Sequence, residues 1–281
     1  MTSRILSRQH FCTIQIPDFR FFLDGQDRVA YPYRKSFSEG RYDPFAILHT
    51  SGSTGVPQPV VLALGTLAAV DAYQLTPSFG GNETIGPPRR GKRLLLGFPL
   101  FHAAGLQFMF GFGFYCGLII VMPPARGPLT AETVALSLDL SKAHTTALPP
   151  SLVVDLYRNP NHHDCIRSLD SILYAGGPLP DEVGSELCHL TRLTTIVGAT
   201  EYPLSPLEHV KPEDWQYVKF SPCGGVSLRP CQDTDICEQV FVKDKEMDNF
   251  QGIFATVPNF DEFSLKDTIS TSSHRARTLA V

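Results

Sequence analysis

Residues 168–191 read SLDSILYAGGPLPDEVGSELCHLT, a short apolar run that breaks into a glycine turn and continues with helical spacing. The neighbouring segments are similar: TTALPPSLVVDLYRN (145–159) predicts a strand, a proline break and a helix, and RLTTIVGATE (192–201) predicts a strand that stops at a polar turn. Alternating buried strands and helices indicate an α/β fold with mostly parallel sheets flanked by helices. Shorter strands after about residue 215 add a β-rich C-terminal part.

The alternation extends toward the N-terminus, where FAILHT (45–50) and RLLLGFPLFH (93–102) predict two further strands. In open parallel sheets, ligands bind where loops leave the carboxyl ends of the strands. We therefore expect ligand binding at the polar turns that follow predicted strands. These turns cover residues 50–55, 102–105, 175–178 and 198–201.

Composition narrows the class of protein. The formal net charge of −4 gives no reason to expect nucleic acid or an anionic membrane as a partner, and RRGKR (89–93) is interpreted as a solvated turn. The seven cysteines include no C-x-x-C pair, and several lie in apolar runs, which favours free thiols in a reducing compartment. The first residues lack the features of a signal peptide, so we expect a cytoplasmic protein.

The longest uncharged stretch is LQFMFGFGFYCGLIIVM (106–122), which contains three glycines and precedes two prolines. It predicts a buried helix over about 103–115, a turn at Gly117 and a buried strand, with a membrane-spanning helix as the alternative. HHDC (162–165) contains possible metal ligands, but no second group of ligands elsewhere matches it. We expect no membrane partner and no His/Cys metal site.

Three of the polar turns suggest chemistry from their residues. TSGSTG (50–55) can present many backbone N–H groups and hydroxyls to phosphate oxygens, although a flexible surface turn is the alternative. His102, after a strand and before small residues, can place an imidazole at a pocket mouth or serve only as a structural histidine. GATE (198–201) combines a hydroxyl and a carboxylate, which suit a phosphate and Mg²⁺.

The order HTSGSTGVPQP, PLFHAAG, AGGPLP and GATE closely resembles the core motifs of the adenylate-forming (AMP-binding) superfamily. YPYRKSF, LHTSGSTG, DWQYVKF and GIFATVPNFDEFSLKD resemble the adenylation domains of fungal nonribosomal-peptide-synthetase-like adenylate-forming reductases. The resemblance implies a partial large N-terminal subdomain of an adenylate-forming enzyme. It divides the chain into an N-terminal segment (1–40), a partial adenylation domain (41–269) and an unmatched tail (270–281).

The resemblance also implies a role for individual residues. His102, Thr200 and Glu201 are the expected catalytic residues: His102 beside the acyl carboxylate and the α-phosphate, Thr200 on the α-phosphate, and Glu201 on Mg²⁺. Asp267 is expected on the ribose hydroxyls of ATP or AMP. Residues near 102–107 and 174–176, with those just after Glu201, are expected to shape the acid pocket. The remaining nucleotide-binding residues, on the phosphates and along the adenine, are Thr50, Ser51, Gly52, Ser53, Thr54, Gly55, Gly176, Gly177, Thr195, Ile196 and Val197.

Several features depart from the family pattern. Gln58 stands where the family loop has a lysine, and Val197 stands where an aromatic residue stacks on adenine. Both changes are expected to weaken nucleotide binding. The hinge, the small C-terminal subdomain with its catalytic lysine, and the carrier domain with its phosphopantetheine are not matched by any segment, so the resemblance implies truncation at both ends.

Two functions follow from the resemblance. The first is ATP-dependent activation of a small carboxylic acid as an acyl-adenylate in fungal secondary metabolism, impaired by the truncation. The second is a non-catalytic remnant that binds nucleotide, or a partner protein of a synthetase-like enzyme. A carrier domain or a sister synthetase is the expected protein partner in either case.

Overall fold

The computed structural model describes residues 15, 17–24, 32–50, 57–86, 89–125, 127–202, 204–232, 236–272 and 275–278. The chain forms two units, Met1–Ser36 and Phe37–Val281. Within the first unit, helix α2 (Phe19–Leu23) begins at Asp18, whose carboxylate accepts a hydrogen bond from the backbone N–H of Arg20. All the elements described below belong to the second unit.

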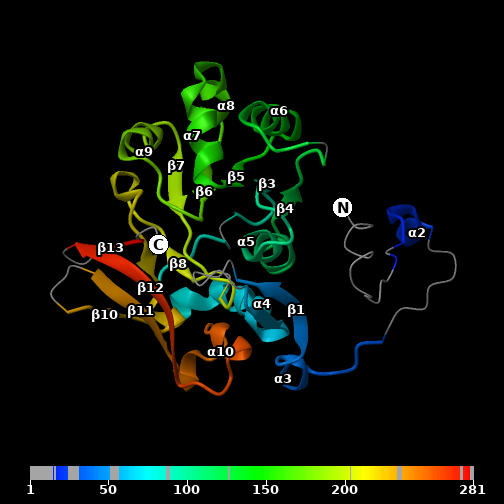
Figure 1. Ribbon diagram of the computed structural model, residues 1–281, viewed down its shortest axis with the longest axis vertical. Coiled ribbons are helices and arrows are strands. Elements are labelled where there is room, and N and C mark those ends of the chain that lie inside the picture. The colour runs from blue at the N-terminus through cyan, green and yellow to red at the C-terminus, as the bar shows by residue number, and fades with distance from the viewer. Residues whose placement is uncertain are drawn as a thin grey trace, which may run out of the picture. The chain divides into compact units, whose positions relative to one another are not determined.

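A parallel sheet of five strands organises the second unit, and Figure 1 shows it between two groups of helices. Its order is β4-β3-β5-β6-β7, and each neighbouring pair is parallel, which confirms the predicted α/β class. The sequence RLLL in β3 has no polar alternation because both faces of this sheet are covered. The strands are β3 (Arg93–Leu96), β4 (Ile119–Val121), β5 (Thr145–Leu148), β6 (Ser171–Tyr174) and β7 (Arg192–Thr195).

The helices pack on the two faces of this sheet in two hydrophobic clusters. Leu95 lies in a cluster with α6, α7, α8 and α9, whereas Leu94 and Leu96 lie in a cluster with α4 and η3. Thr130 begins α6, because its hydroxyl accepts a hydrogen bond from Thr133 N–H at 3.3 Å. The bounds are α4 (Leu64–Ala72), α5 (Ala103–Leu106), η3 (Gln107–Tyr115), α6 (Ala131–Ser141), α7 (Pro150–Arg158), α8 (His163–Arg167) and α9 (Asp181–Leu187).

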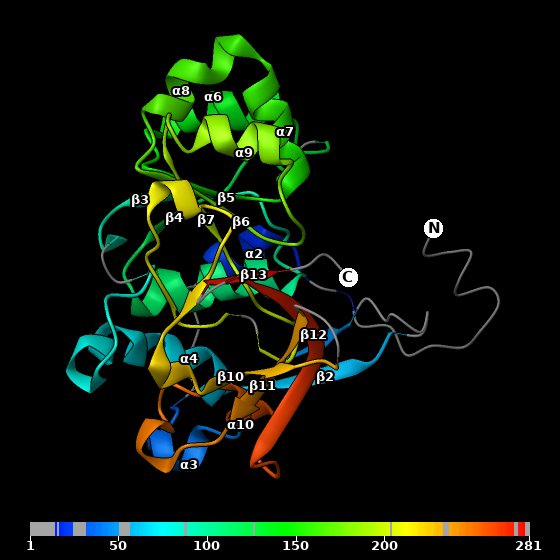
Figure 2. The same cartoon turned by 90° about the vertical axis from the view of Figure 1, so that its left-hand side faces the viewer.

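The predicted β-rich C-terminal part is an antiparallel sheet in the order β10-β11-β12-β13. Figure 2 shows β12, in red, as a long strand beside β10 and β11. The strands are β10 (Val226–Pro230), β11 (Ile236–Val242), β12 (Glu262–Ser272) and β13 (Arg275–Thr278), and β8 (Leu207–Glu208) pairs separately with β9 (Lys219–Phe220). Short helical elements complete the unit: α3 (Phe37–Gly40), η1 (Tyr73–Phe79), η4 (Pro160–His162), η5 (Pro212–Asp214), η6 (Pro222–Gly224), η7 (Lys245–Met247) and α10 (Ile253–Thr256).

The strand over FAILHT does not join the parallel sheet. Strand β1 (Pro44–His49) instead pairs antiparallel with β2 (Pro59–Ala63), and His49 lies opposite Pro59. The expectation that turn 50–55 follows a strand of the parallel sheet is therefore wrong, because β1 and β2 satisfy each other's backbone groups as a two-stranded antiparallel sheet.

Two further expectations concern residues 89–122. The stretch 106–122 divides as predicted into helix, a turn at Gly117 (φ 64°) and strand β4, although the helix is a π-helix over η3. The expected burial of this strand is wrong, because β4 is the edge strand of the sheet and Ile119 is 51% exposed. Every helix in the described ranges is too short or too polar to cross a bilayer. The interpretation of RRGKR as solvated is wrong for Arg89, which is buried and donates to the Ser171 hydroxyl at 3.1 Å. Burial, followed by the nearby Arg192, lowers the pKa of Arg89 to about 10.

Candidate functional site

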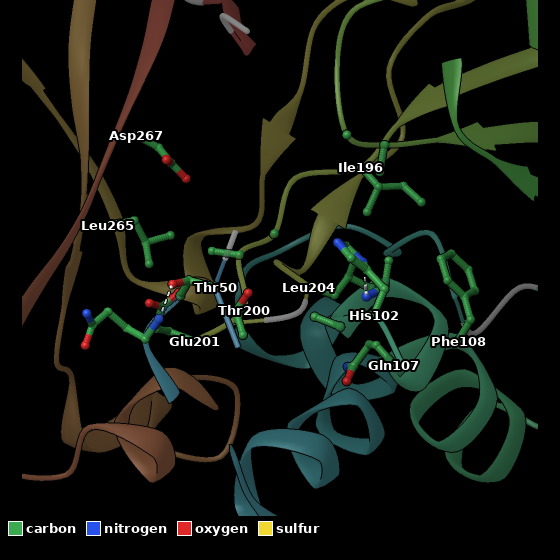
Figure 3. Close-up of a pocket in the computed structure, with 17 residues that line it drawn as sticks. Thr50, His102, Gln107, Phe108, Ile196, Thr200, Glu201, Leu204, Leu265 and Asp267 are labelled. Atoms are coloured by element: carbon green, nitrogen blue, oxygen red, sulfur yellow. Dashed lines mark hydrogen bonds between the residues drawn. The ribbon is translucent and has the colours of Figure 1, made fainter. Parts of the chain in front are cut away.

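A cavity of about 510 Å³ opens at the carboxyl ends of β3, β6 and β7, where the predicted polar turns follow these strands (Figure 3). This volume is within the usual range for small-molecule sites. Seven of the residues predicted to form a nucleotide site line it: Thr50, His102, Gly176, Ile196, Thr200, Glu201 and Asp267. Three of the turns follow β3, β6 and β7 and meet because parallel strands end at one edge of the sheet, whereas Thr50 comes from the β1–β2 pair and Asp267 from β12.

Other predicted residues lie elsewhere. Thr195 and Val197 are buried and do not line the cavity, and Val197 packs in the core cluster that also contains Leu94 and Leu173. Gly177 follows the cavity-lining Gly176 in the chain but does not itself line the cavity. The predicted phosphate-binding residues Ser51, Gly52, Ser53, Thr54 and Gly55 lie outside the described residues.

The flanks of that predicted phosphate loop are described and hold each other. The backbone N–H of Thr50 donates to the Gln58 carbonyl at 3.0 Å, and the Gln58 N–H donates to the Thr50 hydroxyl at 3.1 Å. Both residues line the cavity. One of these hydrogen bonds joins two backbone groups and the other reaches the Thr50 hydroxyl, and together they hold Thr50 and Gln58 side by side. The exposed Gln58 side chain takes no part in this pairing.

Thr200 and Glu201 form the tip of a closed turn. Backbone hydrogen bonds join Ala199 and Tyr202 in both directions, at 2.8 and 3.2 Å. Tyr202 is 1% exposed, and its ring packs edge to face on that of Phe241 with 4.7 Å between the ring centroids. The Tyr202 hydroxyl lies 3.3 Å from the Tyr73 hydroxyl. The buried Tyr202 therefore holds the two polar residues at the cavity edge.

Asp267 reaches the cavity from β12, through an irregularity in the strand. Glu238 pairs with Thr268 and Val240 with Ser264, so that three β12 residues lie opposite a single β11 residue. Lys266, in the middle of this bulge, adopts a φ of 60°, which is uncommon for a residue with a side chain. Asp267 and Leu265, on either side of Lys266, both line the cavity.

Asp267 and Glu201 are electrostatically coupled. Burial raises the pKa of the Asp267 carboxyl, and the charge of Glu201 raises it further. A cation or a hydrogen-bond donor bound between these residues would lower the pKa of Asp267 again, because it would stabilise the charged carboxylate. The described residues contain no group of three or more His, Cys, Asp or Glu that could hold a metal ion by themselves.

His102 stands at the start of α5 and is exposed to the cavity. Its Nδ1 accepts a hydrogen bond from the Ala104 N–H at 3.3 Å. A neutral imidazole that accepts at Nδ1 carries its proton on Nε2. His102 is therefore arranged to donate a hydrogen bond from Nε2.

The cavity has two chemically different ends. Figure 3 shows Asp267 and Leu265 on the strand at one side, and Gln107 and Phe108 on the helix at the other. At the helix side the wall is mostly apolar and includes Ala103, Ala104, Phe108 and Leu204. Leu204, one of the residues just after Glu201 that were expected in the acid pocket, lines the cavity, and so does Leu265, for which the sequence indicated no role.

The family model of AMP-binding enzymes matches residues 19–246. The chain belongs to the AMP-binding enzyme family. This AMP-binding protein is 31% identical over 247 residues to a carboxylic acid reductase of Neurospora crassa, a match that covers 86% of the chain. The chain spans 24% of the length of that relative.

Solved structures agree with the fold of this AMP-binding protein. The N-terminal subdomain of Klebsiella oxytoca NpsA, in complex with 3-hydroxyanthranilyl-AMSN, has a TM-score of 0.67 and 16% identity, with 92% of this chain and 69% of that chain covered. The o-succinylbenzoate coenzyme A synthetase of Bacillus subtilis, in complex with ATP and magnesium, has a TM-score of 0.58 and 20% identity, with 82% and 48% covered. Both confirm that the α/β fold is that of adenylate-forming enzymes.

Proposed function

We propose that this AMP-binding protein binds ATP and a small carboxylic acid in the cavity and joins them as an acyl-adenylate. The observation that carries the proposal is that predicted residues from four separate polar turns, together with Asp267, line one cavity. The names of similar proteins support it. One is a carboxylic acid reductase, and another was solved with ATP and magnesium.

In the proposed reaction, a carboxylate oxygen of the acid attacks the α-phosphorus of ATP. A bond forms between these two atoms, and the bond from the α-phosphorus to the bridging oxygen breaks, so that pyrophosphate leaves with the electron pair. Negative charge accumulates on the phosphate oxygens, and positioned donors and cations stabilise it. Bound Mg²⁺ would neutralise part of this charge, with Glu201 as its protein ligand.

The two ends of the cavity suit the two substrates. Thr50, Thr200, Glu201 and Asp267 supply hydroxyls and carboxylates at one end, where we place the nucleotide, with Asp267 on the ribose hydroxyls. The apolar wall at the α5–η3 end suits the body of the acid. His102 lies between the labelled residues of the two ends in Figure 3, so its Nε2–H can donate to the carboxylate or the α-phosphate.

We propose that residues 41–269 act as an adenylation domain and pass the adenylate to a carrier domain or a sister synthetase. Cys116, Cys165, Cys188 and Cys223 are free thiols, which favours a reducing compartment such as the cytoplasm. Secondary metabolism is proposed only from the resemblance to fungal reductases.

ATP–pyrophosphate exchange with a panel of aryl and alkyl acids tests the proposal. At least one acid should support exchange, and Thr200→Ala and Glu201→Ala should each lower it by about 100-fold or more. The control is Glu213→Ala, which removes an exposed carboxylate that does not line the cavity and should leave exchange unchanged. Absence of exchange with every acid would contradict catalysis. If calorimetry then still detected ATP binding, the non-catalytic, nucleotide-binding alternative would be supported.

A further inference from the structure

A buried glutamine of β11 lies opposite the bulge that carries Asp267. Gln239 is 0% exposed, and neither its Nε2 nor its Oε1 has a hydrogen-bond partner within the described part of the chain. Buried polar atoms in proteins are nearly always paired, because an unpaired group loses its bonds to water without replacement. An amide with two unpaired atoms next to a ligand cavity suggests a partner that comes within reach when the ligand binds.

The strand register places Gln239 against this bulge. Because Glu238 and Val240 on either side of it both have partners on β12, Gln239 is the single β11 residue opposite residues 265–267. In the described part of the sheet these three residues have no ladder partner on β11, and the pairing of β12 with β13 begins only at Ile269. The ladder therefore leaves the position of the three residues to other contacts.

Gln239 and Asp267 lie on the same face of the sheet. On the opposite face, Ser264 Oγ donates to Glu238 Oε1 at 2.6 Å. Side chains alternate between the two faces along a strand, so Gln239 after Glu238, and Leu265 after Ser264, point to the other face. Leu265 and Asp267 both line the cavity (Figure 3), so the Gln239 amide lies next to the two bulge residues that form part of the cavity wall.

We propose that Gln239 is a positioning residue for nucleotide binding. When the ribose engages one oxygen of the Asp267 carboxylate, Gln239 Nε2 donates a hydrogen bond to the other oxygen and holds the carboxylate toward the ribose. This inference rests on the proposed function, because it takes the nucleotide to contact Asp267. Gln239 does not itself line the cavity, so it acts only through Asp267.

The surroundings of Asp267 favour such a donor. Burial and the charge of Glu201 raise the pKa of Asp267, and a hydrogen bond to the carboxylate would offset this effect without adding a charge. The terminal torsion of glutamine is broad, so the amide of Gln239 can rotate toward the carboxylate. A shift of the bulge would break no ladder hydrogen bond with β11, because residues 265–267 have no ladder partner on that strand.

The test compares ATP with dideoxy-ATP, which lacks the two ribose hydroxyls, in the parent and in Gln239→Leu. Calorimetry measures the binding of each nucleotide with Mg²⁺. The variant keeps the size of the side chain and removes the amide, so its ATP affinity should fall about 10-fold, while its dideoxy-ATP affinity should change less than about 2-fold. Without nucleotide, the variant should unfold at a higher urea concentration than the parent, since it removes an unpaired buried amide. Gln239→Met, a second variant without the amide, should behave in the same way.

Gln251→Leu is the matched control. Gln251 is also buried, at 1% exposed, and does not line the cavity, but its amide is paired. Its Oε1 accepts the Asp244 N–H at 2.8 Å, and its Nε2 donates to the Val242 carbonyl at 2.9 Å. Its replacement should lower the urea concentration at which the protein unfolds, the reverse of the Gln239 variants, and should leave the ratio of ATP to dideoxy-ATP affinity unchanged.

The outcomes separate this inference from the proposed function. No binding of ATP to the parent would contradict both. ATP binding by the parent, with the same ratio of ATP to dideoxy-ATP affinity in the two Gln239 variants, would overturn the role of Gln239 alone. An equal loss of affinity for both nucleotides would also overturn it, because a general structural defect gives that result, and so would variants that unfold at a lower urea concentration than the parent.

Discussion

Gly105 offers the sharpest test of how the motif PLFHAAG builds the site. Gly105 lies in α5 and packs against the backbone of Phe98 and Pro99, which precede the helix in the chain. A Cβ at residue 105 would lie 2.1 Å from the Pro99 carbonyl oxygen and 3.0 Å from that of Phe98. The Pro99 carbonyl also accepts the His102 N–H at 3.0 Å, so it cannot turn away without breaking that bond.

The cost of Gly105→Ala follows from these distances. Ordinary contact begins near 3.4 Å, so α5 and the Pro99 segment must separate by about 1 Å or more. Overpacking of this kind costs about 1–3 kcal/mol, at the upper end here because the neighbour is backbone, while alanine gains about 1 kcal/mol in helix propensity. We expect the free energy of unfolding to fall by about 1–2 kcal/mol.

The same displacement should affect function. His102 and Gln107 lie on either side of Gly105, so both move relative to the cavity when α5 shifts. A misplacement of about 1 Å can cost about 100-fold in rate, and we expect a loss of that order in pyrophosphate exchange.

Urea unfolding and pyrophosphate exchange of Gly105→Ala are compared with those of Gly113→Ala. Gly113 lies on the continuing helix η3, and the nearest atom to its Cβ would be the flexible Ile120 side chain at 3.2 Å. This control should leave the free energy of unfolding unchanged or raise it by up to about 1 kcal/mol, because alanine gains helix propensity and the Ile120 side chain can move aside. A Gly105→Ala protein as stable as the control, with full exchange activity, would refute the steric reasoning.

Three further predictions concern charge and burial. Gln58→Lys should tighten ATP binding about 2- to 5-fold, because it adds a cation at the cavity wall, but it should not produce fast adenylation. Calorimetry that showed no gain in ATP affinity would count against a phosphate-binding role for this loop. Burial, followed by the charges of Arg89 and Arg192, lowers the pKa of His209 from 6.5 to about 4. Between these pH values the unfolded chain binds a proton that the folded chain does not, so the free energy of unfolding should fall as the pH drops from 6.5 to 4. His209→Gln should flatten that part of a urea-midpoint profile, and an unchanged slope would contradict it. Burial, followed by Asp71, raises the pKa of the Cys116 thiol to about 12, so iodoacetamide should label Cys116 only after unfolding, as peptide mass spectrometry can check. Rapid labelling of the native protein would show that this thiol is not buried.

The sequence by itself predicted the features that depend on local pattern. The apolar run RLLL and the turn at Gly117 each depend only on their neighbours in the chain, and the structure has a strand and a left-handed glycine there. The order of the polar motifs was sufficient to indicate the family, because each motif is a short contiguous segment.

Tertiary structure decided the features that depend on distant partners. The pairing of β1 with β2, rather than with the parallel sheet, and the burial of Arg89 against Ser171 are choices among non-local contacts that hydrophobic periodicity does not encode. The β12 bulge brings Asp267 close enough to Glu201 to raise its pKa, although 65 positions separate them in the chain. Whether the Gln239 amide finds a partner also depends on which side chains fold around it, and no spacing within the sequence specifies that.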